Sequence, residues 1–312
     1  MTGEDLAIRA ERLSKRYGDT RAADAVDLAI PRGQFFGLLG PNGAGKTSLI
    51  HMLSTLIRPS AGDAWVAGHS VRREKLAVRA SIGVVFQEPA LDRALTAAQN
   101  LRFAGLLNDL PRAEIKKRSD ELLALFGLAD HRDRPAGALS GGMRRALDIA
   151  RGVIHRPQIL FLDEPTIGLD VPNRRAIWRH IARLRAEFGI TVFLTTHHLE
   201  EAENCDEVAF LAAGRIVHGG RPNVLIERFG KYVVEAESDR PKELAERLEA
   251  RLGEALIEAD GVQFRCNHEP ADLGALHAEL AASARAVRWR RPNLNDVFLW
   301  VNRPAQSQRR AA

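Results

Sequence analysis

One eight-residue stretch constrains the fold of this chain more than any other. It runs from Gly40 to Thr47, reads GPNGAGKT and fits the pattern G-x-x-x-x-G-K-[ST] at every position. An apolar run at 34–39 precedes it and a helical pattern at 46–57 follows it. Glycines let backbone N–H groups converge on phosphate oxygens, and the following helix points the positive end of its dipole at the anion. The stretch therefore predicts a strand, a phosphate-binding loop and a helix.

The side chains of this loop have chemically distinct expected roles. Lys46 is expected to reach the β- and γ-phosphates as a point charge, and the hydroxyl of Thr47 to ligate Mg²⁺. The expected ATP-binding residues of the loop are Gly40, Pro41, Asn42, Gly43, Ala44, Gly45, Lys46, Thr47 and Ser48.

A second motif places two carboxylates after an apolar run. The run 159–162 reads ILFL, and Asp163 and Glu164 follow it directly. In open α/β sheets, ligands bind at the carboxyl ends of the strands. Asp163 is therefore expected to hold Mg²⁺, and Glu164 to accept a hydrogen bond from the attacking water and polarise it. Alone this pattern often marks only the end of a strand, but downstream of a phosphate-binding loop it is a strong signal.

A third motif identifies the family that the chain resembles. Residues 139–143 read LSGGM, and residues 195–197 read TTH. With the first two motifs, they make the chain resemble the ATP-binding subunit of an ABC transporter. The resemblance implies a P-loop NTPase core with a helical subdomain at about 90–155. It also implies a head-to-tail homodimer, in which Ser140, Gly141 and Gly142 of one copy face the γ-phosphate bound by the other.

Four further residues take their roles from their positions in this resemblance. Tyr17 matches an adenine-stacking aromatic, with a core or surface tyrosine as the alternative. Gln87 matches the glutamine that contacts Mg²⁺ and the attacking water, and Asp170 anchors a loop that crosses the dimer interface. His197 matches the histidine that contacts the γ-phosphate and the catalytic glutamate. Its neighbour His198 is the alternative, but the two preceding threonines favour His197.

Two shorter segments narrow the resemblance. Residues 87–92, QEPALD, and 292–299, PNLNDVFL, look like those of daunorubicin-resistance and nodulation-type export ATPases. Such subunits work with a separate polytopic permease of the ABC-2 class, which implies a peripheral location on the cytoplasmic face of the plasma (inner) membrane. The resemblance also implies that the permease, rather than this chain, selects the transported substrate.

A soluble ABC ATPase acting on nucleic acid, the ribosome or another soluble complex is the alternative function. The net charge of +5 and the pI of about 9.5 suit it. However, the basic residues are interspersed with 40 acidic ones, the chain has one ATPase core and no sustained heptads appear. Nucleic acid is therefore not an expected partner.

The order of expected elements divides the chain. Residues 1–220 are expected to form the α/β nucleotide-binding domain, 221–303 a small α+β ferredoxin-like accessory domain and 304–312 a flexible tail. Core strands are expected at 6–13, 25–30, 34–39, 82–86, 159–162, 191–195, 208–211 and 215–217, and further core helices at 95–128, broken at Pro111, and at 174–188. Accessory strands are expected at 231–237, 255–258, 262–266 and 286–289, and helices at 242–252, 271–282 and 294–301.

Composition excludes several other classes of protein. The chain is 45% hydrophobic and 27% charged, a globular mixture, and it has no apolar run of 18 residues. The first residues, MTGEDLAIRAERLSKRYG, lack the apolar stretch of a secretory signal. Cys205 and Cys266 match no metal or redox spacing and are expected to be reduced thiols.

Overall fold

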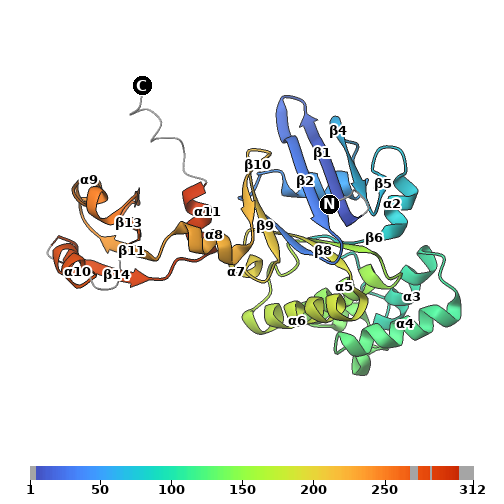
Figure 1. Cartoon of the computed structure of the whole chain (residues 1–312). Coiled ribbons are helices and arrows are strands. Elements are labelled where there is room, and N and C mark those ends of the chain that lie inside the picture. The colour runs from blue at the N-terminus through green and yellow to red at the C-terminus, as the bar shows by residue number, and fades with distance from the viewer. Residues whose placement is uncertain (1–4, 268–272, 282, 302–312) are drawn as a thin grey trace. The chain divides into compact units, whose positions relative to one another are not determined.

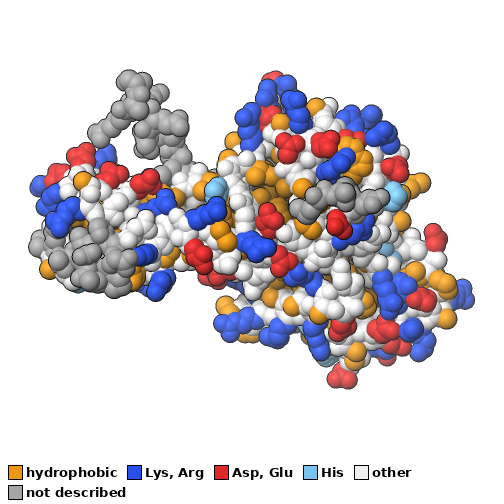
Figure 2. Space-filling model, viewed as in Figure 1, with side chains coloured by type: hydrophobic (Ala, Val, Ile, Leu, Met, Phe, Trp, Pro, Cys, Tyr) orange, Lys and Arg blue, Asp and Glu red, His pale blue; other side chains and the backbone are white. Residues whose placement is uncertain are grey.

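The computed structural model describes residues 5–267, 273–281 and 283–301 of the 312. The chain forms two compact units, a core unit of residues 1–197 and 205–217 and an accessory unit of residues 198–204 and 218–312. The expected tail at 304–312, and residues 271, 272 and 282 of one expected helix, lie outside the described residues. Figure 2 shows basic and acidic side chains interspersed on the face in view, as their order in the sequence predicts.

A largely parallel sheet forms the centre of the core unit and confirms the expected α/β class (Figure 1). Parallel pairing joins five of its six strands, with Asp163 opposite Thr195 and Leu39 opposite Thr196. These residues consequently lie at the same carboxyl edge of the sheet. The strands, in sheet order, are β10 (Arg215–Gly220), β9 (Glu207–Ala212), β3 (Phe35–Leu39), β8 (Thr191–Thr196), β7 (Ile159–Asp163) and β6 (Ile82–Val85).

An antiparallel sheet packs beside the first, and its strands differ in length and number from those expected from the sequence. Its order is β2 (Thr20–Pro31), β1 (Leu6–Tyr17), β4 (Ala61–Val66) and β5 (His69–Ser70). Both β1 and β2 are longer than expected, because register shifts and positive φ angles at Arg12 and Ala25 interrupt their side-chain alternation. Strands β4 and β5 are not among the expected strands. Within β4, Gly62 has φ +72°, and a Cβ there would lie 2.3 Å from the Arg12 carbonyl oxygen.

Helices complete the core unit. A shared apolar core joins both sheets to α1 (Lys46–Leu53), which ends four residues before the expected Ile57 because Thr55 adopts φ +64°. Pro111 precedes α4, so the expected break in the 95–128 pattern is confirmed. Helix α2 was not expected. The remaining core helices are α2 (Lys75–Ser81), α3 (Ala97–Leu107), α4 (Arg112–Leu125), α5 (Gly141–Val153) and α6 (Val171–Phe188), with short 3₁₀ turns η2 (Ala129–His131) and η3 (Ala136–Ala138).

The accessory unit contains the expected ferredoxin-like βαββαβ arrangement. Its sheet order is β12 (Ala255–Ile257), β13 (Gly261–Cys266), β11 (Tyr232–Glu237) and β14 (Ala286–Arg290), and every pair is antiparallel. Val234, Leu248 and Phe264 belong to its apolar core. Helices α7 and α8 were not expected. The helices of this unit are α7 (Leu199–Ala202), α8 (Pro222–Phe229), α9 (Pro241–Leu252), α10 (Leu273–Ala281) and α11 (Leu294–Val301).

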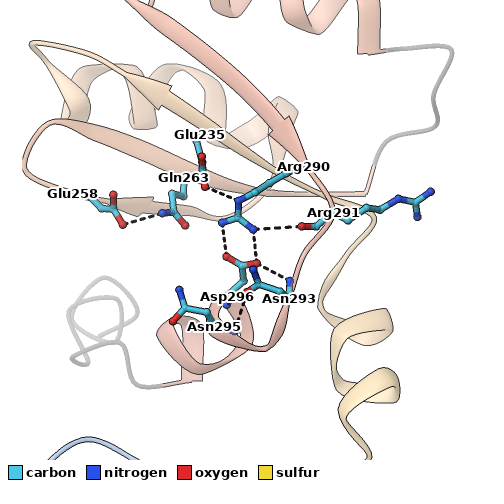
Figure 3. Close-up of polar contacts among 8 residues, drawn as sticks. All are labelled: Glu235, Glu258, Gln263, Arg290, Arg291, Asn293, Asn295 and Asp296. Atoms are coloured by element: carbon cyan, nitrogen blue, oxygen red, sulfur yellow. Dashed lines mark hydrogen bonds and ion pairs between the residues drawn. The ribbon is translucent and has the colours of Figure 1, made fainter. Parts of the chain in front are cut away.

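An ion pair between Arg290 and the buried Asp296 connects the last strand of the accessory unit to its last helix (Figure 3). The Nη1 and Nη2 atoms of Arg290 each donate to the Asp296 carboxylate at 2.7 Å, and Nε donates to Glu235 at 2.6 Å. Asp296 is fully buried and also accepts the backbone N–H of Asn293 at 2.8 Å. These bonds join the end of β14 to the first turn of α11, so the segment 292–299 has a clear structural role.

Candidate nucleotide-binding site

The phosphate-binding loop follows β3 and requires its glycines. Gly45 is the N-cap of α1 with φ +107°, and a Cβ there would lie 1.9 Å from the Ala22 carbonyl oxygen. A Cβ at Gly40 would lie 2.4 Å from the Leu211 carbonyl oxygen, and Gly43 has φ +81°. The loop therefore lies against neighbouring backbone and leads directly into the start of α1, where the helix dipole favours an anion.

Lys46 lies inside this loop with its side chain buried. Its Nζ atom donates to the Gly40 carbonyl at 2.8 Å and the Pro41 carbonyl at 3.1 Å. It also lies 3.8 Å from Oε1 of Glu164. Burial lowers the pKa of Lys46, and the charges of Glu164 and Asp163 oppose that shift. The ammonium is thus held by two carbonyls of the loop, with the Glu164 carboxylate at a longer distance.

Glu164 links the acidic strand to the expected histidine. Its backbone has φ +47°, and its N–H donates to the Thr195 carbonyl at 3.0 Å. This turn directs Oε2 to within 3.1 Å of Nδ1 of His197. The preceding Asp163 is buried and accepts a hydrogen bond from the Thr195 hydroxyl. The structure therefore places His197 beside Glu164, whereas His198 is the N-cap residue of α7.

The other expected residues around the loop are more accessible. Thr47 is exposed and Ser48 half-buried at the start of α1, and Gln87 is exposed just after β6. Tyr17 is 49% exposed at the end of β1, with Nζ of Lys15 at 5.0 Å from its ring centroid. Tyr17 is consequently not a core residue, and about half of its surface is open to solvent.

The LSGGM motif and Asp170 form a second group. Ser140 caps α5 by accepting the Met143 N–H at 3.2 Å, and Asp170 caps α6 by accepting the Asn173 N–H at 2.9 Å. Gly142 brings the two helix starts together, since a Cβ there would lie 2.2 Å from Oδ1 of Asn173. Ser140 and Gly141 are exposed. The expected site residues thus fall into two groups. One surrounds the phosphate-binding loop and the end of β7, and the other is the LSGGM signature motif at the start of the signature helix α5, with Asp170.

Arg145 and Asp148 on α5 were not among the expected site residues. Arg145 contacts the backbone of the acidic pair, and Asp148 accepts the backbone N–H of Ala90, close to Gln87. Burial lowers the pKa of Arg145 and raises the pKa of Asp148. Arg145 donates to the carbonyls of both Asp163 and Glu164 at 3.3 Å. The sequence did carry a sign of these two residues, because they form a pair of opposite charges three residues apart on an otherwise apolar face of a helix.

Comparison with known proteins places the chain among transporter ATPases. A family model described as "ABC transporter" matches residues 23–167. The chain is 41% identical over 308 residues to the daunorubicin resistance ATP-binding protein DrrA2 of Streptomyces coeruleorubidus, covering 95% of both chains. It is 40% identical over 304 residues to the Nod factor export ATP-binding protein I of Ralstonia nicotianae, covering 95% of this chain and 94% of that one.

Solved structures share the core fold. CbiO1 of Clostridium perfringens, described as part of the ABC transporter complex cbiONQ, superposes with a TM-score of 0.67 at 30% identity, covering 80% of this chain and 96% of that one. The ATP-binding cassette MJ0796, described as a dimer in a post-hydrolysis state with ADP and Pi, superposes with a TM-score of 0.63 at 26% identity. That match covers 69% of this chain and 98% of the cassette.

Proposed function

The chain belongs to the ABC transporter family, and we propose that it is the ATP-hydrolysing subunit of an exporter that energises a separate membrane permease. The convergence of Lys46, Asp163, Glu164 and His197 at one edge of the core sheet carries this proposal. The names of its relatives, which are resistance and export ATP-binding proteins, support the direction of transport. Residues 1–220 are assigned to ATP chemistry, and residues 221–303 to an accessory role.

Each residue of the site has a role that its environment supports. Lys46 and the backbone of the loop hold the phosphates, and the exposed ring of Tyr17 stacks on the adenine. The carboxylate of Glu164 accepts a hydrogen bond from water and polarises it for attack. His197, 3.1 Å from Glu164, orients that carboxylate and contacts the γ-phosphate. This arrangement supplies positioning and electrostatic stabilisation, which phosphoryl transfer chiefly requires.

Mg²⁺ fits the donor atoms of this site. Thr47, Gln87 and Asp163 offer a hydroxyl, an amide and a carboxylate oxygen, which are the hard ligands that Mg²⁺ prefers. Among the described residues, no group of three or more His, Cys, Asp or Glu side chains forms a metal site of its own. Thr47, Gln87 and Asp163 would hold the ion together with the nucleotide, and the bound ion would neutralise charge on the phosphates.

A second copy of the chain completes the site in this proposal. Ser140 and Gly141 lie exposed at the start of α5, so their N–H groups and the helix dipole can face a phosphate bound elsewhere. The dimeric post-hydrolysis form of the similar cassette MJ0796 supports a dimer, and we propose that the two copies are arranged head to tail. Asp170 holds the start of α6 beside this surface by capping that helix.

The permease partner supplies the path across the membrane. Within the described part of the chain, no helix is long and apolar enough to cross a bilayer. We place the subunit on the cytoplasmic face of the plasma membrane, where ATP is available. ATP-driven closure transmits force only if the contacts with the permease differ between the open and closed states.

One experiment separates the exporter from the soluble alternative. Tagged Glu164→Gln protein, trapped with MgATP, is extracted gently from native membranes, and the proteins that copurify are identified. A polytopic membrane protein is the expected partner, with Lys46→Ala as the control that fails to trap ATP. Recovery in the soluble fraction with RNA, ribosomes or a soluble complex would favour the alternative function.

A further inference from the structure

The guanidinium of Arg145 binds four backbone carbonyls next to the proposed catalytic residues. Its Nε donates to Pro165 at 2.6 Å, Nη1 to Phe86 at 2.5 Å, and Nη2 to Asp163 and Glu164 at 3.3 Å each. These carbonyls come from the ends of two neighbouring strands, β6 and β7. One side chain on α5 therefore connects both strand ends.

Asp148 extends these connections to the other side of Gln87. Its Oδ1 accepts the Ala90 N–H at 3.3 Å and the Arg151 Nε at 3.1 Å, while Oδ2 lies 3.5 Å from Nη1 of Arg145. Because Arg145 binds Phe86 and Asp148 binds Ala90, the backbone on both sides of Gln87 is attached to α5. Gln87 itself remains exposed.

Glu164 is the residue that most needs such support. Its positive φ of +47° is an unfavourable conformation for a residue with a Cβ. The N–H of Glu164 is held by the Thr195 carbonyl, and the carbonyl of Glu164 is held by Arg145. Both ends of this residue are thus fixed, which sets the direction in which its carboxylate leaves the strand.

Packing alone does not account for Arg145. Its side chain is 5% exposed, and a buried guanidinium costs free energy that an apolar residue on the same helix face would not. Its partner Asp148 approaches only to 3.5 Å, too far for the strong bidentate pairing that best offsets such a cost. The donors of Arg145 are directed instead at the backbone of the site.

We propose that Arg145 is a positioning residue for ATP hydrolysis, which holds Glu164 and the flanks of Gln87 in a fixed relation to the signature helix α5. The proposal rests on the proposed function of Glu164. Helix α5 begins at the exposed Ser140 and Gly141, so the contacts of Arg145 connect the surface that faces the second copy to the residue that polarises water. Loss of these contacts should slow the chemical step and leave nucleotide binding intact.

The test compares Arg145→Lys with the wild type in the full-length chain with MgATP. Lysine keeps a positive charge beside Asp148, but one ammonium cannot span carbonyls on two strands. We expect kcat to fall about 10–100-fold, as when other partners that orient site residues are removed, with KM and the ATP dissociation constant near wild type. The melting temperature should fall, because carbonyls that Arg145 satisfied lose their donor, so kcat is measured well below it.

Arg118→Lys is the matched control. Arg118 also lies on a helix, donates to a backbone carbonyl, that of Ile154, at 3.0 Å and pairs with Glu114 at 2.8 Å, but it does not contact the proposed site. Its kcat should remain at the wild-type value. An Arg145→Lys protein with wild-type kcat, or one whose kcat loss is matched by Arg118→Lys or by an equal loss of ATP affinity, would overturn the proposal.

Two further variants keep the outcome decisive. If Arg145→Lys does not fold, Asp148→Asn replaces it, since it retains an acceptor for Ala90 and removes the charge beside Arg145. Its kcat should fall by a smaller factor, and a wild-type kcat would then overturn the proposal. Glu164→Gln is measured in parallel, because retained turnover there would refute the proposed role of Glu164 as the water-polarising residue, on which the proposal rests, rather than the role of Arg145.

Discussion

Arg145 in the core unit and Arg290 in the accessory unit each lie beside a fully buried aspartate, but they use their donors differently. Arg290 binds Asp296 through two bonds of 2.7 Å, and these bonds raise the pKa of Arg290. Arg145 lies 3.5 Å from Asp148, and burial lowers the pKa of Arg145. The accessory pair satisfies its own charges, whereas the core pair directs its donors at the backbone of the site. The contrast indicates that one pair serves stability and the other serves function.

Asp296→Ala tests the stabilising side of this contrast and should have the largest effect on stability. It leaves the buried part of Arg290 without its main partner and the Asn293 N–H without an acceptor. We expect the free energy of unfolding of the accessory unit to fall by about 1.5–3 kcal/mol, measured by urea denaturation, because Arg290 keeps its bond to Glu235. Glu243→Ala breaks the exposed pair with Arg240 and is the control, expected to change stability by less than about 1 kcal/mol. Equal effects of the two variants would remove the contrast.

Lys46→Ala tests the functional side. In the proposed site, the Lys46 ammonium donates charge-assisted hydrogen bonds to the phosphates of the nucleotide. Because alanine cannot form these bonds, MgATP binding should weaken by about 1.5–3 kcal/mol. Burial already lowers the pKa of Lys46, so removing it should not reduce the stability of the nucleotide-free chain. Nucleotide titration and thermal unfolding of the same preparation check both statements. Unchanged affinity, or a large loss of stability, would contradict them.

Tyr17→Ala should weaken nucleotide binding by a similar or smaller amount. A base that stacks on an exposed aromatic ring contributes about 1–3 kcal/mol, whichever base it is. Tyr17→Phe keeps the ring and should bind like the wild type. An equal affinity of the alanine variant for ATP would make Tyr17 an ordinary surface residue.

Mild acidification should destabilise the core unit by the smallest amount. Burial lowers the pKa of both His155 and His180, so the unfolded chain binds more protons than the native chain once the pH falls below about 6.5. Stability is therefore fully present above the unfolded pKa and declines as the pH falls, by at most about 1.4 kcal/mol per pH unit for each histidine. His155→Gln should reduce this slope in urea titrations between pH 7.5 and 5.5, and an unchanged slope would exclude His155 as a source.

The sequence predicted the parts of the site that local patterns encode. The loop from Gly40 to Thr47 and the pair Asp163-Glu164 are contiguous, and their flanking periodicity gave the strand and helix that position them. His197 was assigned by motif order, and the structure places it against Glu164. The βαββαβ order likewise predicted the accessory fold.

Long-range contacts account for what the sequence did not predict. Strand β4 depends on pairing with β1. Its second residue, Gly62, must be a glycine because a Cβ there would clash with the Arg12 carbonyl oxygen. The role of Arg145 depends on Phe86, which is 59 residues away, and on a strand that follows α5. The periodicity of hydrophobic residues does not predict such a contact. Arg145 binds backbone carbonyls, which every residue carries, so no partner residue type marks the contact in the sequence.

The central claim is that Glu164 polarises the attacking water at a site where Lys46 holds the phosphates. The most direct measurement is steady-state phosphate release from MgATP by full-length Glu164→Gln protein, with ATP binding and sedimentation measured on the same sample. The account predicts that turnover is lost, that ATP affinity is retained and that a closed dimer accumulates. Phosphate release at the wild-type rate would contradict it.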